Sequence, residues 1–354
     1  MSVVGQVRYE RAYYYCGHCG HGIAPADAEL RVAGAELTPA AREVAALAGT
    51  LTSFAEAAEK SLPKMSGLRL SESTVERATE AAGASVGERL GNGEVFGEAK
   101  PWSWPTDSQG RTVGYVSLDA TGVGIQGPGA KAAEGRMVDV GMIFAAGADG
   151  RPARIRALAG LYDRPELGEQ MRRQAAQAGL ESAEVWVGLT DGGNGLDEFL
   201  RVYFPRAEVI LDFYHAAEHL NDLAKCLHPG DEGLAGEVAG RWCHQLKHEG
   251  GAAVLAALEA LNLKGRKASV RECHRLVSGY VRNNLFRMDY PRCQANGWLI
   301  GSGHIESACK GVVGWRLKGN GMRWSESGAD AVSHLRALFK SEKSQWDAFW
   351  ASAA

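Results

Sequence analysis

The chain has 354 residues, of which 45% are hydrophobic and 23% are charged, and its formal net charge is -3. This composition is typical of a globular protein with room for two or three domains. No apolar run is long enough to predict a membrane span, and the first residues lack the apolar core of a secretory signal. The seven cysteines are odd in number and unevenly spaced, so we expect reduced thiols in a cytoplasmic protein rather than a disulfide framework.

The first motif along the chain is a pair of cysteines. Cys16 and Cys19 form C-x-x-C within YYYCGHCGHG, which is half of a zinc ribbon. No second pair follows closely, and His18 and His21 are too near to complete a tetrahedral Zn²⁺ site. We therefore interpret segment 1–35 as a partial zinc-ribbon-like segment, with two free thiols in a loop as the alternative.

Residues 36–100 are predicted to be helical. Apolar residues in LTPAAREVAALAGTLTSFAEAAEK recur with a helical period, and Pro63 is predicted to end that helix. After a turn with glycine, Ser71 caps a second helix. This pattern is typical of a helix-turn-helix DNA-binding region, and an ordinary helical hairpin is the alternative. The residues predicted at the DNA-reading end of the second helix are Glu72, Ser73, Glu76 and Arg77. Two of these four are acidic, which weakens the DNA-binding interpretation.

The central region alternates between predicted strands and helices. TVGYVSLDATGVGI, MVDVGMIFAAG and ARIRALAGLYD indicate three successive strands, and a helix near 165–180 follows. Then come the strand EVWVGLTDGG, a short helix, and the strand ILD, which runs into another helix. The order β-β-β-α-β-α-β-α predicts an α/β fold with a mixed sheet. The stretch GVGIQG at 122–127 matches a dinucleotide-binding pattern, but no phosphate-binding helix is predicted after it, so we expect a hairpin loop.

Acidic residues follow two of the predicted strands. Asp119 is expected at the end of the first strand and Asp191 at the end of the fourth, where side chains face a common crevice. Glu306 lies in GSGHIESACK, whose glycines permit a close approach to the sheet. Three converging carboxylates suit Mg²⁺ or Mn²⁺, and two such ions support phosphoryl transfer. His304 is a candidate for proton transfer or phosphate contact, with a purely structural histidine as the alternative.

The C-terminal third is basic although the whole chain is slightly acidic. Between positions 264 and 292, and again between 310 and 343, Lys and Arg far outnumber Asp and Glu. A sequence pI near 6.4 argues mildly against a dedicated nucleic-acid binder. The two basic stretches could nevertheless face phosphates, and the alternative is a solvated helix surface.

The motifs taken together resemble DDE transposases with an RNase H-like catalytic core, and most closely the ISKra family of bacterial insertion sequences. The resemblance covers nearly the whole chain and rests on YYCGHCGHG, SLDATGV, LTDGGNGL, ILDFYHAAEHL and GSGHIESACKGVVGWRLKGNGMRWS. It implies that Asp119, Asp191 and Glu306 form the metal triad for DNA cleavage and strand transfer. The long interval between Asp191 and Glu306 implies an all-helical insertion.

The resemblance also implies roles around the triad. Asp212 and His215 match a (Cys or Asp)-x-x-His motif that supports the active site or the DNA end. Trp315 or Trp324 would stack on an unpaired base, unless both are core residues. The basic residues that follow Glu306 are candidates for phosphate contacts: Arg316, Lys318 and Arg323.

The same region contains a zinc-peptidase signature. His215, Glu218 and His219 spell H-x-x-E-H, whose two histidines share one face of a helix. A peptidase would need a third ligand, for which Glu237 and Glu249 are the candidates, and it would leave the three carboxylates unused. We therefore predict that the match is coincidental.

The expected organisation has five parts: 1–35, the partial zinc ribbon; 36–100, the helical DNA-binding region; 110–222, the first part of the RNase H-like core; 223–296, the all-helical insertion; and 297–345, the helical region that completes the core. Such a protein would bind terminal inverted repeats and target DNA as a homo-oligomer, in the cytoplasm and at the nucleoid of a bacterium. Family members usually carry more DNA-binding sequence at the N-terminus, which implies a shortened copy or an internal start. The alternatives are a truncated or domesticated DNA-binding protein without strand-transfer activity, and an RNase H-like nuclease.

Overall fold

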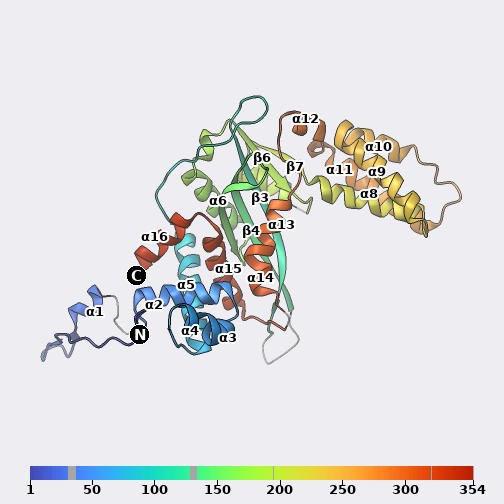
Figure 1. The fold of residues 1–354 in the computed structure, drawn as a ribbon. Coiled ribbons are helices and arrows are strands. Elements are labelled where there is room, and N and C mark those ends of the chain that lie inside the picture. The colour runs from blue at the N-terminus through green and yellow to red at the C-terminus, as the bar shows by residue number, and fades with distance from the viewer. Residues whose placement is uncertain (31–36, 128–133, 194, 320, 354) are drawn as a thin grey trace.

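The centre of the molecule is a five-stranded mixed sheet (Figure 1). This computed structural model describes residues 1–30, 37–127, 134–193, 195–319 and 321–353. The order across the sheet is β5-β4-β3-β6-β7, in which β4 is antiparallel to both β3 and β5, and β6 is parallel to both β3 and β7. The strands are β3 (Val113–Ile125), β4 (Glu134–Ala146), β5 (Pro152–Gly160), β6 (Val185–Thr190) and β7 (Ala207–Leu211).

Helices alternate with the later strands in the predicted order. The helix α6 (Arg164–Gln177) and the short turn η3 (Leu180–Ser182) precede β6, α7 (Leu196–Tyr203) precedes β7, and α8 (Phe213–Leu227) follows it. The prediction of an α/β fold with a mixed sheet is therefore confirmed.

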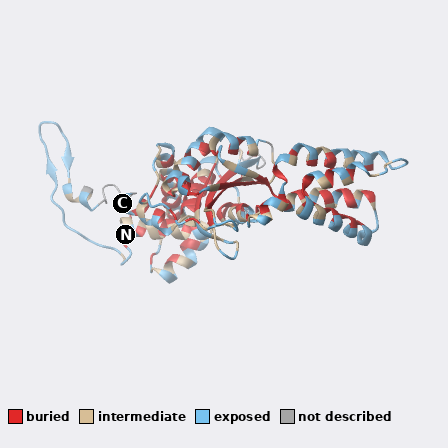
Figure 2. Ribbon diagram, turned by 90° about the horizontal axis from the view of Figure 1, so that it is seen from above, coloured by how far each residue is buried: buried red, intermediate tan, exposed pale blue. Residues whose placement is uncertain are grey.

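Helices cover both faces of this sheet, and Figure 2 shows that buried residues concentrate between the layers. On one face, α6 and α7 pack with α5 (Glu72–Gly91) and α16 (Lys343–Ala353). The other face packs against three consecutive pieces of helix, α13 (Gly303–Ala308), the π-helix η5 (Cys309–Gly314) and α14 (Trp315–Leu317). We call these three pieces the 303–317 segment.

Residues 213–300, all of which the structure describes, contain helices and no strand. This agrees with the predicted all-helical insertion between the last strand and Glu306. The helices extend away from the sheet in Figure 1, and α8 packs against both α9 and α11. The elements after α8 are α9 (Glu232–Glu249), α10 (Gly251–Glu259), α11 (Ala268–Asn284), η4 (Leu285–Arg287) and α12 (Tyr290–Ala295).

The N-terminal helices differ from the prediction in one respect. The first long helix, α2 (Pro39–Leu51), ends before Ser53, whose side chain caps α3 (Phe54–Glu56) by accepting from the N–H of Glu56. The chain continues through η1 (Ala57–Ser61) into α4 (Leu62–Met65). The prediction that Pro63 ends the helix is wrong, because the helical backbone continues from η1 past Pro63 to Met65.

The second predicted helix is α5, and Ser71 caps it as expected. Its predicted reading end remains exposed, so a DNA contact there stays a prediction. One side of α5 is buried along α15 (Glu326–Lys340). Gly83 lies at this crossing, where an added Cβ would stand 1.9 Å from the carbonyl oxygen of Ala331.

The strand β3 ends at Ile125, as the stretch TVGYVSLDATGVGI indicated, and it includes most of GVGIQG. It continues through Ile125, which pairs with Glu134 of β4, so Gly122 to Ile125 are strand rather than loop. The expected hairpin is present, since β3 and β4 are antiparallel neighbours, but its bend begins after Ile125. Residues 128–133, part of the stretch predicted to lack a phosphate-binding helix, lie outside the described residues.

Among the helices of the described residues, none is long and apolar enough to cross a membrane.

The contact between α5 and α15 predicts that a glycine-to-alanine substitution lowers the free energy of unfolding, although such a substitution in a helix usually raises it. Replacing a helical glycine by alanine normally stabilises a helix by about 1 kcal/mol. Gly83→Ala is expected instead to destabilise the fold by about 1–3 kcal/mol, because the methyl group would overlap the backbone of Ala331. Urea denaturation followed by circular dichroism measures the change.

Gly91→Ala is the matched control at the end of the same helix. Its added Cβ would meet nothing closer than 3.9 Å, so we expect unchanged or slightly higher stability. Equal stability of the two variants would contradict the close approach at Gly83.

Candidate active site

Asp119 and Asp191 lie on the same face of the sheet. The parallel pairing of β3 with β6 ends at Ser117 opposite Leu189, and each aspartate lies two residues further along its own chain. Because alternate residues of neighbouring strands point to the same side, both carboxylates face the side covered by the 303–317 segment. We call these two residues the aspartate pair. Asp119 differs from its prediction in lying within β3 rather than at its end, because the pairing with β4 continues beyond it.

The aspartate pair carries few of the contacts that would neutralise it. Asp119 accepts the N–H of Ala120 at 2.7 Å and the thiol of Cys309 at 3.5 Å, and Asp191 accepts the N–H of Gly193 at 2.8 Å. Within the described part of the chain, neither aspartate forms a salt bridge. Burial raises the pKa of Asp119, and the negative charge of Asp191 raises it further. Two such carboxylates fit a divalent cation, which would relieve their repulsion.

Glu306 lies beside this pair without joining it. Ile305 on α13 and Cys309 at the start of η5 are buried, whereas Glu306 on α13 is exposed. Burial raises the pKa of the Cys309 thiol, and both Asp119 and Glu306 contribute to this shift. Across the described ranges, no three His, Cys, Asp or Glu side chains are grouped so as to hold one metal ion. The three carboxylates were expected to converge on one metal ion. The structure places Asp119 and Asp191 on the same face of the sheet, whereas Glu306 is exposed and does not join them.

Asp212 has a structural place next to the site. It caps α8 by accepting the N–H of Tyr214 at 2.6 Å, and it also accepts the hydroxyl of Ser302. Ser302 immediately precedes α13, so Asp212 ties the last strand to the 303–317 segment. His215 lies one turn into α8, and its ring is 6.3 Å from that of Tyr280.

Among the residues that the structure describes, the zinc-peptidase match finds no third ligand. The ring of His215 lies 5.2 Å from that of His219, which itself lies 4.0 Å from the ring of Tyr280. Burial lowers the pKa of His219, as expected for a packed imidazole. Glu237 and Glu249 lie on α9, where they line a different surface pocket. The geometry agrees with a coincidental match.

Tyr280 is a site residue that the sequence did not reveal. It comes from α11 of the helical region, and its buried hydroxyl has no hydrogen-bond partner among the described residues. The hydroxyl lies 3.0 Å from where a Cβ on Gly192 would stand, directly beside the aspartate pair. Burial raises the pKa of Tyr280 to about 12, and the charges of Asp191 and Asp212 act in the same direction. The phenol therefore stays protonated and can donate a hydrogen bond at this edge.

Arg287 on η4 is a second contribution from the helical region. Its guanidinium is buried and donates to Thr190 at 3.2 Å and to Asn284 at 2.6 and 2.9 Å. Burial lowers the pKa of Arg287, while Asp197, Tyr280 and Asp191 oppose that shift. The sequence indicated only that Arg287 belongs to a basic stretch. Its contact with Thr190, which is 97 residues away in the chain, leaves no pattern in the local sequence.

The three predicted phosphate contacts have different environments. Arg316 is only 2% exposed and lies against the rings of Phe54 and Trp324, so the prediction that it meets phosphate is wrong in this arrangement. Lys318 is exposed and donates to Thr121, two residues beyond Asp119, which places a cation beside the aspartate pair. Arg323 is exposed, so its phosphate contact stays a prediction.

The two tryptophans after Glu306 have opposite environments. Trp324 is a core residue, 7% exposed, and its indole N–H donates to the carbonyl of Leu317 at 3.1 Å. Trp315 is 76% exposed, so the alternative that both are core residues is wrong. Helical packing on the sheet explains the difference, because Arg316 and Leu317 take the inward positions of α14.

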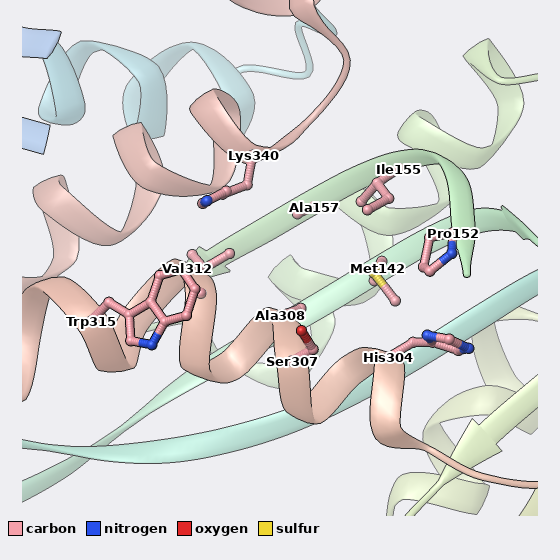
Figure 3. Close-up of a pocket in the computed structure, with 11 residues that line it drawn as sticks. Met142, Pro152, Ile155, Ala157, His304, Ser307, Ala308, Val312, Trp315 and Lys340 are labelled. Carbon is pink, nitrogen blue, oxygen red and sulfur yellow. The ribbon is translucent and has the colours of Figure 1, made fainter. Parts of the chain in front are cut away.

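His304 faces away from the aspartate pair. It packs against Phe144 at 5.4 Å and lines a pocket between the 303–317 segment and the strands β4 and β5 (Figure 3). Burial lowers the pKa of His304, and a hydrogen bond to the backbone of Gly150 partly opposes this. The structural alternative therefore describes its position better than a role in proton transfer.

The N-terminal cysteines lie at the tip of a two-stranded hairpin. β1 (Tyr14–Tyr15) pairs with β2 (Gly22–Ile23), and α1 (Pro25–Glu29) follows. Both thiols are exposed, and hydrogen bonds from Cys19 lower the pKa of Cys16. Two adjacent thiols with one lowered pKa fit half of a Zn²⁺ site, and the described residues supply no further pair of ligands.

Comparisons of the chain with models of protein families and with curated proteins gave no match.

Binding of a divalent cation at the aspartate pair can be measured without any assay of activity. At ten times its Kd, Mn²⁺ is expected to stabilise the wild type by about 1.4 kcal/mol and to raise Tm by roughly 2 °C. Asp119→Asn and Asp191→Asn are expected to lose this shift. Differential scanning fluorimetry across a Mn²⁺ titration gives the values.

Asp139→Asn is the control for that titration. Asp139 lies opposite Ala120 in β4 but faces the other side of the sheet, where it is 3.6 Å from Arg164. It is expected to keep the Mn²⁺ shift. The same loss in all three variants would place the cation elsewhere.

Two buried tyrosines offer a paired test of the unpartnered hydroxyl. Tyr290 donates to the carbonyl of Leu211 at 3.0 Å, so Tyr290→Phe is expected to cost about 1 kcal/mol. Tyr280→Phe loses no hydrogen bond and is expected to leave the free energy of unfolding unchanged or higher. Urea denaturation compares them, and an equal loss in Tyr280→Phe would mean that its hydroxyl has a partner.

Proposed function

We propose that the chain is a DDE-type DNA transposase that cleaves DNA strands and joins them to target DNA by metal-dependent phosphoryl transfer. The observation that carries this proposal is the aspartate pair, which lies just beyond the point where the pairing of β3 with β6 ends, beside the helix with Glu306. The sequence resemblance to ISKra-family transposases names the same three residues.

The strand arrangement supports an RNase H-like core. Three antiparallel strands followed by two parallel ones, in the order β5-β4-β3-β6-β7, is the mixed sheet expected for that fold. The helical region between α8 and α13 then corresponds to the insertion expected between the second Asp and the Glu.

Asp119 and Asp191 would hold Mg²⁺ or Mn²⁺, with Glu306 as the third ligand. When bound, such an ion supplies Lewis-acid stabilisation of the attacking and leaving oxygens of a phosphodiester. Glu306 would have to turn inward from its exposed position, because Cys309 now occupies the place next to Asp119. A bound divalent cation would favour that movement, because it attracts the carboxylate of Glu306 toward the two aspartates.

The neighbouring residues have direct uses in this chemistry. Lys318 lies beside Thr121 and can bind a phosphate oxygen near Asp119. The protonated hydroxyl of Tyr280 can donate to a phosphate oxygen on the side of Asp191. Both groups are donors directed at an edge where negative charge would gather during the reaction.

Terminal inverted repeats and target DNA are the proposed partners, with a homo-oligomer assembled on them in the cytoplasm of a bacterium. The exposed front of α5, the exposed Arg323 and the Cys16–Cys19 hairpin are the proposed places of end recognition. Whether the hairpin holds Zn²⁺ depends on ligands beyond the two thiols.

Metal-dependent cleavage and strand transfer on DNA with the element's flanking ends tests the proposal. Asp119→Asn, Asp191→Asn and Glu306→Gln are each expected to reduce cleavage by more than about 100-fold, since loss of an outer-shell partner of a metal site alone costs about 10–100-fold. Binding to the same DNA is expected to change little. Cleavage and joined products are separated on denaturing gels.

Asp139→Asn is again the matched control and is expected to cleave. Cleavage without joining would identify a nuclease of the same fold instead. DNA binding without any cleavage by the wild type would favour the domesticated DNA-binding protein. Cleavage that survives in Asp191→Asn would mean that the active site lies elsewhere.

A further inference from the structure

The helices α8 and α11 pack against each other in the helical region. Near the aspartate pair, the ring of His219 on α8 lies 4.0 Å from that of Tyr280 on α11. At the other end of α8, the carbonyl of Leu227 accepts a hydrogen bond at 3.0 Å from Arg266, which lies just before the start of α11. Because these contacts follow opposite orders along the two helices, α8 and α11 run antiparallel.

Cys226 and Cys273 occupy matching positions between those two contacts. Cys226 follows His219 by seven residues, and Cys273 precedes Tyr280 by seven residues. Seven residues make about two turns of an α-helix, so each cysteine lies on the same face as the aromatic residue of its own helix. Since the helices are antiparallel, the two cysteines are neighbours across the helix contact, as His219 and Tyr280 are. We call them the Cys226–Cys273 pair.

The two thiols of this pair are close together and are not sealed from solvent. A side-chain hydrogen bond joins Cys273 to Cys226. Both are free cysteines and both are half-buried. Burial and the hydrogen bond raise the pKa of Cys273 to about 12, so Cys273 keeps its proton at neutral pH. Thiols within hydrogen-bonding distance on two packed helices can form a disulfide with little movement of the backbone.

A metal ion is a poorer explanation of the Cys226–Cys273 pair. A structural Zn²⁺ ion takes four ligands, and the described residues supply no third Cys, His, Asp or Glu side chain placed to join the two sulfur atoms. The nearby carboxylate of Asp222 lies 3.8 Å from the ammonium group of Lys225 instead. Two adjacent thiols without a metal ion can exchange with a small disulfide.

We propose that Cys226 and Cys273 form a reversible intramolecular disulfide that fastens α8 to α11. The oxidant is a low-molecular-weight disulfide. The thiolate of Cys226 attacks one sulfur of the oxidant, which gives a mixed disulfide and releases the first small thiolate. The sulfur of Cys273 then attacks the sulfur of Cys226, which completes the protein disulfide and releases the second small thiolate. The two protein thiols are thereby oxidised, the small disulfide is reduced, and the two protons of the protein thiols pass to the leaving thiolates.

The disulfide would restrain the helix that carries Tyr280. Cys273 and Tyr280 lie about 10 Å apart along the axis of α11. The hydroxyl of Tyr280 stands next to Gly192, directly beside the aspartate pair. Oxidation therefore holds one wall of the crevice in place, whatever reaction the aspartate pair performs, so this inference is independent of the proposed function.

Peptide mapping of the folded, oxidised protein tests the proposal. The background variant is Cys16→Ser with Cys19→Ser, because those two exposed thiols can also pair. This protein is equilibrated with oxidised glutathione, its remaining free thiols are blocked with iodoacetamide, and it is digested with trypsin.

The sequence makes the diagnostic product unambiguous. Trypsin releases peptides 226–241 and 272–275, each of which contains a single cysteine. The expected result is one cross-linked species of these two peptides in the mass spectrum, which dithiothreitol separates into its parts.

Oxidation is also expected to raise the Tm of the background variant by roughly 3–5 °C, because the disulfide closes a long loop of the unfolded chain. Cys226→Ser and Cys273→Ser, each added to the background variant, are expected to lose both the cross-linked species and the shift. Cys243→Ser is the matched control, since Cys243 is another half-buried cysteine of the helical region, and it is expected to keep both.

The mapping of the background variant decides the proposal even if a serine variant fails to fold. Absence of the cross-linked species from the folded, oxidised protein would overturn the proposal. Glutathione that remains on Cys226 as the final product, or a cross-link from peptide 226–241 to a different cysteine, would overturn it as well. None of these results depends on whether the protein cleaves or joins DNA.

Discussion

The candidate active site depends on the point at which the central strand loses one of its two neighbours. β3 is held by β6 only as far as Ser117, whose hydroxyl donates to the carbonyl of Leu189 at 2.8 Å. Beyond that point β3 continues with β4, and on the side of β6 it is bridged again at Ile125, by Trp324. The opening between β3 and the chain after β6 is a crevice of the kind where open α/β sheets bind ligands. Asp119 and Asp191 lie on its two sides, so the strand register alone brings them together.

A second constraint fixes the segment that carries Glu306. Arg336 of α15 donates to the carbonyls of Gly311 and Val312 in the π-helix and to that of Thr50 at the end of α2. Arg316 donates to the carbonyl of Gly49 at 2.7 Å. Burial lowers the pKa of both arginines to about 10, so both remain charged at neutral pH.

These two arginines connect elements that are far apart in the sequence. A buried cation is tolerated only where other groups replace its water. Backbone carbonyls do so for Arg336, whereas Arg316 has one carbonyl partner and is also stabilised by the charges of Glu76 and Glu80. The N-terminal helices, predicted as a separate DNA-binding region, are thereby joined to the 303–317 segment. A change in the N-terminal helices that moved Thr50 would therefore disturb the hydrogen bonds of Arg336 to the segment that carries Glu306.

The sequence predicted what local pattern and strand period control. The order of strands and helices, the cap at Ser71 and the meeting of Asp119 with Asp191 follow from hydrophobic period and from the rule for strand ends. The sequence did not predict which face of the 303–317 segment turns toward the sheet. The outward position of Glu306 and the burial of Arg316 were therefore not predicted. Contacts between distant segments leave no sequence pattern, which is why Tyr280 was missed.

The helical region between α8 and α13 is more than a spacer. It supplies the hydroxyl of Tyr280 and the guanidinium of Arg287 to the same edge that β3 and β6 form. A buried hydroxyl without a partner is uncommon in folded proteins, and its usual explanation is a ligand or water that completes it. The aspartate pair needs positive charge, and the Tyr280 hydroxyl needs an acceptor. A phosphodiester that arrives with a divalent cation would satisfy both at once, whereas a chain that only held DNA in place would have no use for either.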